Sequence, residues 1–233
     1  MNTAVIIPAY RESKNIPTLL VRIFKILPKA MIVIVDDSPK EESEKLKKNL
    51  RYKNRQMRII CRSKKLGRGS AVIMGLKEAL KDNKLQYFFE MDADLAHDPK
   101  DFEKFLRKRD EADLIIGSRY LSGSKIINWP ARRFILSRIA INTFLKIWLG
   151  LHLSDYTNGF RLYNRKAVEF IMKANLREAG FISLSETAYK LKKAGFKISE
   201  VPISFTDRKY GKSNAGVREL IKSLIGAIRI RIS

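Results

Sequence analysis

The chain has 233 residues, with 47 lysines and arginines against 24 aspartates and glutamates, so its net charge is +23. Its length is sufficient to bury a hydrophobic core, and its 45% of hydrophobic residues excludes a disordered chain. The positive surface predicts an anionic partner: nucleic acid, anionic lipid or a phosphorylated substrate. The single cysteine, Cys61, excludes an internal disulfide, so the sequence does not require an oxidising compartment.

The first half of the chain alternates short apolar runs with helical patterns. Strands are predicted at residues 4–8, 31–35, 57–61, 87–91 and 114–117. Helices are predicted between them, at residues 15–27, 41–50, 69–81 and 99–109. Strands and helices that alternate at this spacing indicate an α/β fold with a mostly parallel sheet sandwiched by helices. Cys61 ends the third strand, where we expect a small core residue.

The second half begins with a long apolar stretch at residues 134–153. It is predicted to be a helix that is apolar almost all round, apart from a narrow polar stripe with one residue in every four. A membrane-spanning helix needs about 20 mostly uncharged residues, so this segment is a poor candidate for one. The stripe consists of Arg138, Asn142, Lys146 and Gly150.

Residues 214–232 are predicted to form a basic amphipathic helix, with Arg218, Lys222 and Arg229 opposite an apolar face. Such a helix either docks on the domain or lies in the interface of an anionic membrane. Two apolar helices in one small chain favour the membrane. The apolar face consists of Val217, Leu220, Ile221, Leu224, Ile225 and Ile228.

No targeting segment is expected at the start of the chain. Residues 3–9 already have the pattern of a strand, so we do not expect a signal peptide. Together with the two apolar helices, this predicts a cytoplasmic protein that is peripheral on the cytoplasmic face of a membrane.

Polar clusters follow three of the predicted strands. They are Tyr10-Arg11-Glu12 after the first strand, Asp36-Asp37 after the second and Asp92-Ala93-Asp94 after the fourth. Ligands of parallel sheets bind beyond the carboxyl ends of the strands. We therefore expect the three clusters to form one binding site at that edge.

Asp92 and Asp94 are the candidate metal ligands. Mg²⁺ and Mn²⁺ prefer oxygen ligands and accept substrate phosphates as part of their coordination. A metal held there would neutralise a diphosphate leaving group. An Asp-x-Asp sequence alone is a weak signal, but its place at a strand end beside Asp36-Asp37 strengthens the prediction.

Two further features allow two interpretations each. Asp37 can accept hydrogen bonds from a nucleobase or ribose, or it can cap the helix that follows. The segment around Gly67 and Arg68 either lets the backbone approach a phosphorylated ligand or is simply a flexible basic turn.

The order of these motifs resembles family 2 glycosyltransferases. The motifs are PAYRE (8–12), VDDS (35–38), LGRG (66–69), MDAD (91–94) and GSRY (117–120). More narrowly, the chain resembles dolichyl-phosphate (polyprenyl-phosphate) mannose synthases. That match rests on residues 129–138, SDYTNGFR (154–161), VPISF (201–205), Asp207-Arg208 and GKS (211–213).

The resemblance implies a GT-A fold, a nucleotide-sugar-binding half at residues 1–120, and an acceptor-binding, membrane-interface half at residues 121–233 of a single domain. It also assigns roles to individual residues. Those for the nucleotide sugar are Pro8, Tyr10, Glu12, Asp37, Gly67, Asp92, Ala93 and Asp94. Those for the acceptor phosphate are Arg119, Arg133, Ser137, Arg208 and Lys212. Those expected to be catalytic are Asp94, Arg119 and Arg208.

The chain departs from the family at Ala96, where a polar residue often lies near the metal. The departure leaves water or Asp94 alone to complete the metal coordination. We also do not expect the family's membrane-spanning tail. The chain resembles the shorter subclass, which relies on interfacial helices or on a separate membrane subunit.

The implied reaction is attack by a dolichyl or polyprenyl phosphate on a nucleotide sugar, with inversion. GDP-mannose is the favoured donor and UDP-glucose the alternative. A phosphate acceptor is already largely ionised, with a second pKa near ~6, so it needs positive charge rather than a general base. We expect structural roles for His97 and for His152 at a helix end. Glu186 either contacts the donor sugar or is solvated.

Three other classes of protein fit the sequence less well. A sugar nucleotidyltransferase carries a glycine-rich loop after its first strand, where this chain has PAYRES (8–13). A nucleic-acid-binding protein would explain the charge of +23, but no recognition motif is present, so we expect no nucleic-acid partner. A non-catalytic membrane scaffold requires that Asp92 and Asp94 be dispensable.

Overall fold

The structure, a computed structural model, describes residues 2–50, 56–135, 137–138, 142–178, 180–207 and 217–232. The strands are β1 (Thr3–Ala9), β2 (Met31–Asp36), β3 (Met57–Cys61), β4 (Tyr87–Glu90), β5 (Leu114–Ser118), β6 (Lys125–Ile127), β7 (Arg161–Asn164), β8 (Ile198–Pro202) and β9 (Ser204–Thr206). The helices are α1 (Asn15–Ile26), α2 (Lys40–Asn49), α3 (Arg68–Ala79), α4 (Phe102–Arg107), α5 (Ala131–Ile135), α6 (Thr143–Leu149), α7 (Arg165–Lys173), α8 (Ile182–Lys193) and α9 (Val217–Ile232), with a 3-10 turn η1 (Pro99–Asp101).

A seven-stranded sheet with the order β3-β2-β1-β4-β7-β5-β8 forms the centre of the molecule. β1, β2, β3 and β4 run parallel to one another, and β8 is parallel to β5. Only β7 runs antiparallel to the strands on either side of it in this sheet. A separate sheet pairs β6 with β9. The predicted mostly parallel α/β sheet is confirmed.

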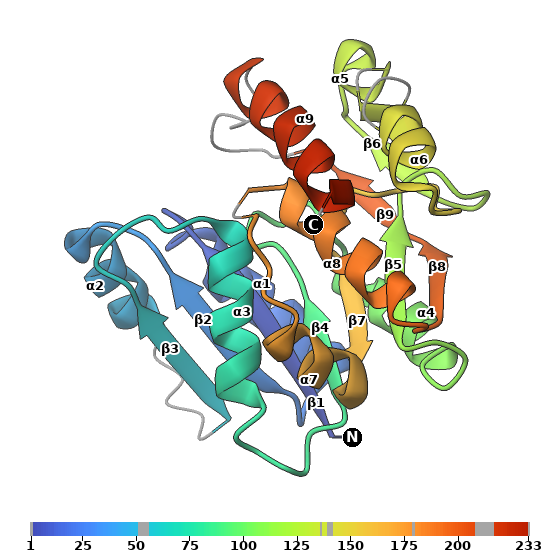
Figure 1. Cartoon of the computed structure of the whole chain (residues 1–233). Coiled ribbons are helices and arrows are strands. Elements are labelled where there is room, and N and C mark those ends of the chain that lie inside the picture. The colour runs from blue at the N-terminus through green and yellow to red at the C-terminus, as the bar shows by residue number, and fades with distance from the viewer. Residues whose placement is uncertain are drawn as a thin grey trace.

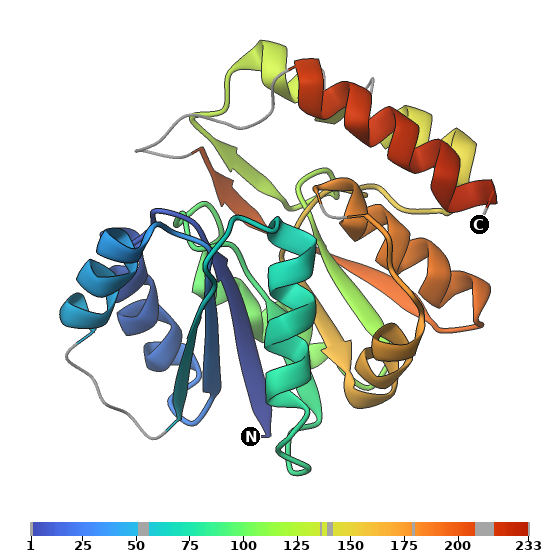
Figure 2. The same cartoon turned by 60° about the vertical axis from the view of Figure 1, so that its left-hand side comes forward.

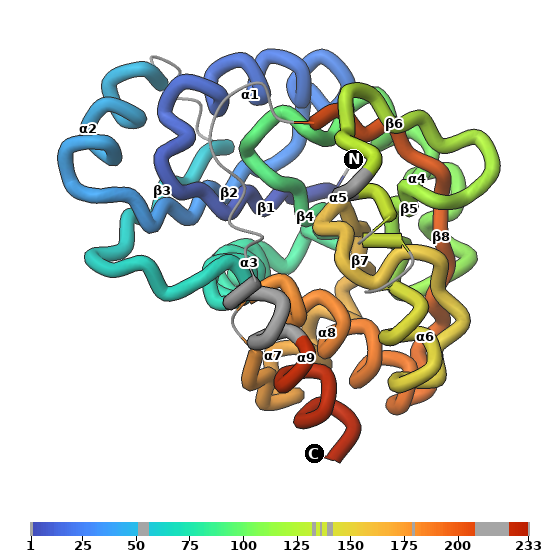
Figure 3. The backbone as a smooth tube through the Cα atoms, turned by 90° about the horizontal axis from the view of Figure 1, so that it is seen from above, coloured from blue at the N-terminus to red at the C-terminus, as the bar shows by residue number. Residues whose placement is uncertain are grey.

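Helices cover both faces of the sheet, so its central strands are buried on both sides (Figure 1). Seen from above, α1 and α2 lie on one side of β1 to β4, and α3, α7 and α8 lie on the other (Figure 3). Alternate residues of β1 supply the two cores. Val5 packs in the core that contains Ile16 of α1, whereas Ile6 packs in the core that contains Leu76 of α3.

The helix predicted at residues 134–153 is confirmed in part. Its described residues up to Leu149 lie in α5, in π-helical turns at 137–138 and 142, and in α6, whereas residues 150–153 are not helical. The side chain of Asn142 is buried, donating to the carbonyl of Ser137 at 2.6 Å and accepting from the backbone N–H of Tyr156 at 2.8 Å. Gly150 ends α6 with φ of 65°, a left-handed conformation that favours glycine. Two members of the supposed polar stripe therefore have structural roles.

α9 docks on the molecule through a different face from the apolar one seen in the sequence. Gly226, Ala227 and Ile230 are buried against α6 and α8, and the indole N–H of Trp148 donates to the carbonyl of Ala227 at 2.8 Å. Figure 2 shows α9 running alongside α6 at the edge of the molecule. The part of the apolar face whose side chains the structure describes remains outside: Leu224, Ile225 and Ile228 are exposed, as is Ile232 at the end of the helix.

Cys61 is exposed, so its expected place in the core is wrong. It ends β3, which is the outermost strand of the sheet and has a neighbour on one side only. A residue at the end of such a strand is covered less than one in the centre.

The loop that enters β7 is fixed by a buried arginine. Arg161 is 0% exposed, and its guanidinium donates to the carbonyls of Tyr156 at 3.1 Å, Asn158 at 2.9 Å and Leu184 at 2.7 Å. Those contacts join residues 156–158 to α8. Buried carbonyls need partners, so Arg161 determines the shape of this loop.

Replacing Arg161 by methionine should lower the free energy of unfolding by about 3 kcal/mol, because it leaves buried carbonyls without donors. Equilibrium urea unfolding measures the change. Arg107→Met is the matched control, because the Arg107 side chain is 80% exposed and lies 3.8 Å from Glu103. The control should change the free energy of unfolding by less than about 0.5 kcal/mol. Equal effects of the two substitutions would contradict this account.

Candidate active site

The polar clusters that follow β1, β2 and β4 meet at one edge of the sheet, as the sequence predicts. These strands are neighbours and parallel, so their carboxyl ends lie together. The backbone N–H of Asp37 donates to the carbonyl of Ala9 at 3.0 Å. The N–H of Arg11, which has a φ of 61°, donates to the hydroxyl of Ser38 at 2.7 Å. The loops after β1 and β2 are thus bonded to each other.

Asp37 is buried and holds Arg62, the residue that follows β3. The guanidinium donates to both carboxylate oxygens at 2.5 and 2.7 Å, and the N–H of Leu66 donates to Asp37 at 3.0 Å. Arg62 also donates to the hydroxyl of Ser70 at 2.5 Å. The prediction that Asp37 caps α2 is wrong, since α2 begins after Pro39 without a side-chain cap. Asp37 instead joins the ends of β2 and β3 to α3.

The residues expected to hold the nucleotide lie along the same edge. Pro8 is half-buried within β1, and Glu12 accepts from the side chain of Asn15 at 2.6 Å at the start of α1. The Lys65 ammonium lies 3.9 Å from the ring centre of Tyr10, a cation–π contact. Tyr10 and Lys65 thus bring the loop after β1 to the segment that precedes α3.

Gly67 precedes α3 with φ of 95°, which only glycine adopts readily. Arg68, the first residue of α3, donates to the carboxylates of Asp92 and Glu90. Burial alone would lower the pKa of Arg68, but the charges of Asp92 and Glu90 outweigh it and raise that pKa. The positive charge of the turn is therefore directed at carboxylates of this chain.

Asp92 and Asp94 lie on one loop after β4, with buried Ala93 between them and Leu95 at a φ of 64°. One carboxylate oxygen of Asp94 accepts from the N–H of Ala96 at 3.1 Å. The described residues contain no group of three or more His, Cys, Asp and Glu side chains placed for a metal. Two carboxylates that share a cation with substrate phosphates are a usual arrangement for Mg²⁺, so this donor set fits a phosphate-bound divalent ion.

His97 lies within this charged group. It is 1% exposed, and its ring stacks on Phe160 with centroids 5.1 Å apart. Burial lowers the pKa of His97, and Asp92, Asp94, Arg119 and Arg68 all act on it electrostatically. His97 therefore packs where the Asp92–Asp94 loop approaches Arg119.

Arg119, which follows β5, is held by the fully buried carboxylate of Asp155. Its Nε and Nη2 atoms donate to the two oxygens at 2.7 and 2.8 Å, and Nη2 also donates to Thr157 at 2.9 Å. Burial lowers the pKa of Arg119, but the Asp155 carboxylate outweighs it and raises that pKa. The guanidinium lies 5.1 Å from the ring centre of Trp129 and 5.4 Å from that of Phe205. Arg119 is thus a fixed cation beside aromatic rings.

Glu200 of β8 fixes Asp155 in turn. Its carboxylate accepts from the N–H groups of Ser154 at 2.8 Å and Asp155 at 3.0 Å, and from the Ser154 hydroxyl at 2.8 Å. Burial raises the pKa of Glu200, although these hydrogen bonds oppose the rise. The loop that carries Asp155 is therefore attached to β8.

The other residues expected at the acceptor are placed only in part. The hydroxyl of Tyr120, the residue that follows Arg119, donates to that of Ser137 at 2.7 Å, so Ser137 lies close to Arg119 in the structure. Arg133 lies on α5, and its side chain is outside what the structure describes. Arg208 and Lys212 lie outside the described residues.

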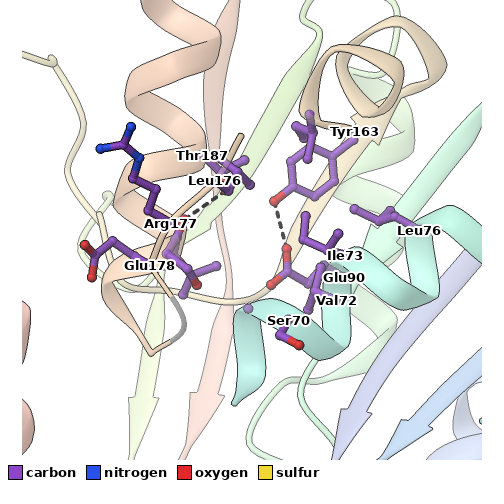
Figure 4. A pocket seen from close by; sticks show the side chains of 14 residues that line it. Ser70, Val72, Ile73, Leu76, Glu90, Tyr163, Leu176, Arg177, Glu178 and Thr187 are labelled. Atoms are coloured by element: carbon purple, nitrogen blue, oxygen red, sulfur yellow. Dashed lines mark hydrogen bonds between the residues drawn. The ribbon is translucent and has the colours of Figure 1, made fainter. Parts of the chain in front are cut away.

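Glu186 is buried, so the prediction of a solvated side chain is wrong. Its carboxylate accepts from the backbone N–H groups of Arg177 at 3.0 Å and Glu178 at 2.9 Å, and lies 3.1 Å from the Lys190 ammonium. It thus holds the segment before α8. This segment borders a cavity of about 260 Å³ among α3, α7 and α8, with Tyr163 on its wall (Figure 4).

Sequence reasoning missed the arginine and carboxylate partners of the site: Arg62 for Asp37, Arg68 for Asp92, and Asp155 for Arg119. A signal existed for Arg62, because it follows a strand that neighbours the strand ending at Asp36. Asp155 lies in the SDYTNGFR segment, but its partner is 36 residues away and no local pattern joins them.

Residues 4–172 match the sequence profile of the family described as Glycosyl transferase family 2. The chain is 34% identical over 222 residues to polyprenol monophosphomannose synthase of Mycolicibacterium smegmatis, an alignment that covers 93% of this chain and 83% of that protein. It is 31% identical over 213 residues to undecaprenyl-phosphate mannosyltransferase of Micrococcus luteus, covering 91% of this chain and 87% of that protein.

Solved structures show the same fold. Glucosyl-3-phosphoglycerate synthase from Mycobacterium tuberculosis, in complex with Mn²⁺, UDP-glucose and phosphoglyceric acid, matches with a TM-score of 0.67 at 15% identity, covering 99% of this chain and 78% of that chain. The same enzyme in complex with UDP matches with a TM-score of 0.64 at 16% identity, covering 98% of this chain and 79% of that chain. The expected GT-A fold is confirmed. By its profile match and its two relatives above 30% identity, the chain belongs to glycosyl transferase family 2.

Proposed function

We propose that this glycosyltransferase moves a mannosyl group from GDP-mannose to a dolichyl or other polyprenyl phosphate, with inversion at the anomeric carbon. One observation carries the proposal: the ring of His97, three residues after Asp94, lies 5.9 Å from that of Phe205, which in turn lies 5.4 Å from the Arg119 guanidinium. A site for a diphosphate and a site for a second phosphate are thereby adjacent. The names of the two relatives supply the sugar and the lipid class.

On the donor side, the edge formed by β1, β2 and β4 would hold the nucleotide, with Tyr10 and Glu12 at one end of it. Asp92 and Asp94 would hold Mg²⁺ or Mn²⁺ together with the diphosphate. When bound, the metal would supply Lewis-acid charge that stabilises the departing nucleoside diphosphate. The chain's own contribution is to orient these carboxylates before the donor arrives.

On the acceptor side, Arg119 would orient the lipid phosphate. A phosphate oxygen is already ionised near neutral pH, so the site has to position it rather than remove a proton from it. The bidentate bond to Asp155 holds the guanidinium still. Trp129 and Phe205 beside it present apolar surface suited to the first isoprene units of the lipid. Arg208, Lys212, Arg133 and Ser137 remain proposed phosphate ligands.

We further propose that α9 rests in the interface of an anionic membrane, on its cytoplasmic face. Its apolar residues Leu224 and Ile228 point outward, and Ile232 is 78% exposed. Arg229 and Arg231 accompany them, and positive charge near the surface attracts anionic lipid. Among the residues that the structure describes, no helix is long and apolar enough to span a bilayer. A separate membrane subunit is a further proposed partner.

Transfer of labelled sugar from GDP-mannose and UDP-glucose to a short polyprenyl phosphate tests the reaction. We expect lipid-linked product from GDP-mannose with Mg²⁺ or Mn²⁺, and its loss when EDTA removes the metal. Product from UDP-glucose alone would replace the sugar and keep the reaction class. Product that persists in EDTA would contradict the proposed metal.

Asp94→Ala should lower kcat/KM for transfer by at least about 100-fold, because the diphosphate loses the charge that a metal supplies. Asp110→Ala is the matched control, since Asp110 bonds the hydroxyl of Tyr87 at the opposite end of β4. Its kcat/KM should not change. Circular dichroism checks that both variants are folded, and full activity in Asp94→Ala would exclude its role.

The double variant Leu224→Ser/Ile228→Ser should bind vesicles that contain phosphatidylglycerol about 30-fold more weakly, because two half-exposed apolar side chains contribute roughly 2 kcal/mol. Vesicle sedimentation measures the binding. Val21→Ser is the control, since Val21 is 62% exposed on α1, on the far side of the sheet. Unchanged binding of the double variant, or an equal loss in Val21→Ser, would remove α9 from the proposed interface.

A further inference from the structure

Arg68 connects three parts of the active site through one side chain. Its Nε and Nη2 atoms lie 2.9 and 2.8 Å from the same oxygen, Oδ1, of Asp92, and its Nη1 atom pairs with Glu90. Its Nη2 atom also approaches the carbonyl of Gly159 at 3.4 Å. A single guanidinium therefore joins the start of α3, the end of β4 and the loop before β7.

Glu90 holds this guanidinium in place from the interior. Its side chain is 2% exposed, and its other oxygen accepts from the hydroxyl of Tyr163 at 2.8 Å, as Figure 4 shows. A buried carboxylate with two partners is fixed, and it fixes the arginine in turn. The Tyr163 pKa is raised by burial and by the Glu90 charge, so its hydroxyl remains a donor.

The contact with Gly159 requires glycine for a steric reason. A Cβ atom at that position would lie 1.9 Å from Nη2 of Arg68 and 3.2 Å from Oδ1 of Asp92. The room for the guanidinium is therefore provided by the absence of a side chain at residue 159. An alanine there would displace Arg68 while leaving its charge in the protein.

We propose that Arg68 is the positioning residue of the divalent metal site, an inference that rests on the proposed function. The Asp92 side chain is 24% exposed, whereas that of Glu90 is 2% exposed. Glu90 alone would satisfy a purely structural role for Arg68. The additional bonds to Asp92 orient the carboxylate that would face the nucleotide in the proposed function. Ligating carboxylates are commonly held in this way, and loss of such a partner weakens metal binding.

Arg68 places one positive charge beside the carboxylates of Glu90 and Asp92. Removing Arg68 makes the group more negative, which by charge alone would strengthen cation binding. Orientation and charge therefore predict opposite effects of the substitution, and a measurement can separate them.

The test is Mn²⁺ binding followed by electron paramagnetic resonance of the free ion, with saturating GDP or UDP. We expect Arg68→Met to weaken Mn²⁺ binding by about 10- to 100-fold. Gly159→Ala should weaken it to a similar extent, although it retains the arginine. Because both act through one contact, the double variant should bind Mn²⁺ no more weakly than Arg68→Met alone.

Controls separate this role from charge and from folding. Lys77→Met removes an exposed positive charge from the same helix and should not change Mn²⁺ binding. Arg68→Lys keeps the charge but cannot hold Asp92 with two nitrogens, so it should remain weakened; binding as in the unmodified chain would overturn the positioning role. Unchanged or tighter binding by Arg68→Met would do the same. If the unmodified chain does not bind Mn²⁺ in the presence of GDP or of UDP, the proposed metal of the reaction is contradicted, and the role of Arg68 with it.

Discussion

The proposed active site depends on pairing buried and half-buried carboxylates with arginines. Removing a charge from water costs several kcal/mol unless a partner and hydrogen bonds compensate it. Asp37 with Arg62, Asp92 with Arg68, and Asp155 with Arg119 meet this requirement at three places along the sheet edge. The partners in these pairs are 25, 24 and 36 residues apart, so each pair joins separate loops. The pairs therefore hold the loops at this edge of the sheet in fixed positions relative to one another.

The same requirement divides the many positive residues of the chain into two groups. A few arginines are buried with carboxylates or backbone carbonyls and belong to the architecture, as Arg161 does. Many of the other basic residues that the structure describes are exposed and give the surface its charge, so the net charge of +23 overstates the charge available inside the site. Arg229 of α9 shares features of both groups of positive residues. It is exposed, but it also lies 3.7 Å from the carboxylate of Glu178, in the segment that Glu186 holds.

The sequence allowed the sheet edge to be predicted better than the side-chain contacts at it. Continuous apolar runs such as that of β1 identify strands that are buried on both faces, and the polar residues after them mark the edge. β7 was missed because its four residues, RLYN, are too few to show either a continuous apolar run or an alternating pattern. The helix expected at residues 134–153 ends earlier, at Leu149, because Gly150 adopts a left-handed conformation. Arginine pairs are not predictable from local patterns, since their partners are distant in sequence.

The arrangement around Arg119 indicates how such a site can select a phosphate acceptor. A guanidinium bonded through Nε and Nη2 to a fully buried carboxylate cannot follow a mobile ligand, because leaving Asp155 unpaired would cost several kcal/mol. In the proposed reaction the acceptor would therefore bring its phosphate to the arginine. An anion gains most from a cation whose position is already fixed, since no reorganisation is needed on binding. A neutral hydroxyl would gain little from the same cation and would still require a base. The rigidity of the Arg119–Asp155 pair is thus consistent with the proposed lipid-phosphate acceptor.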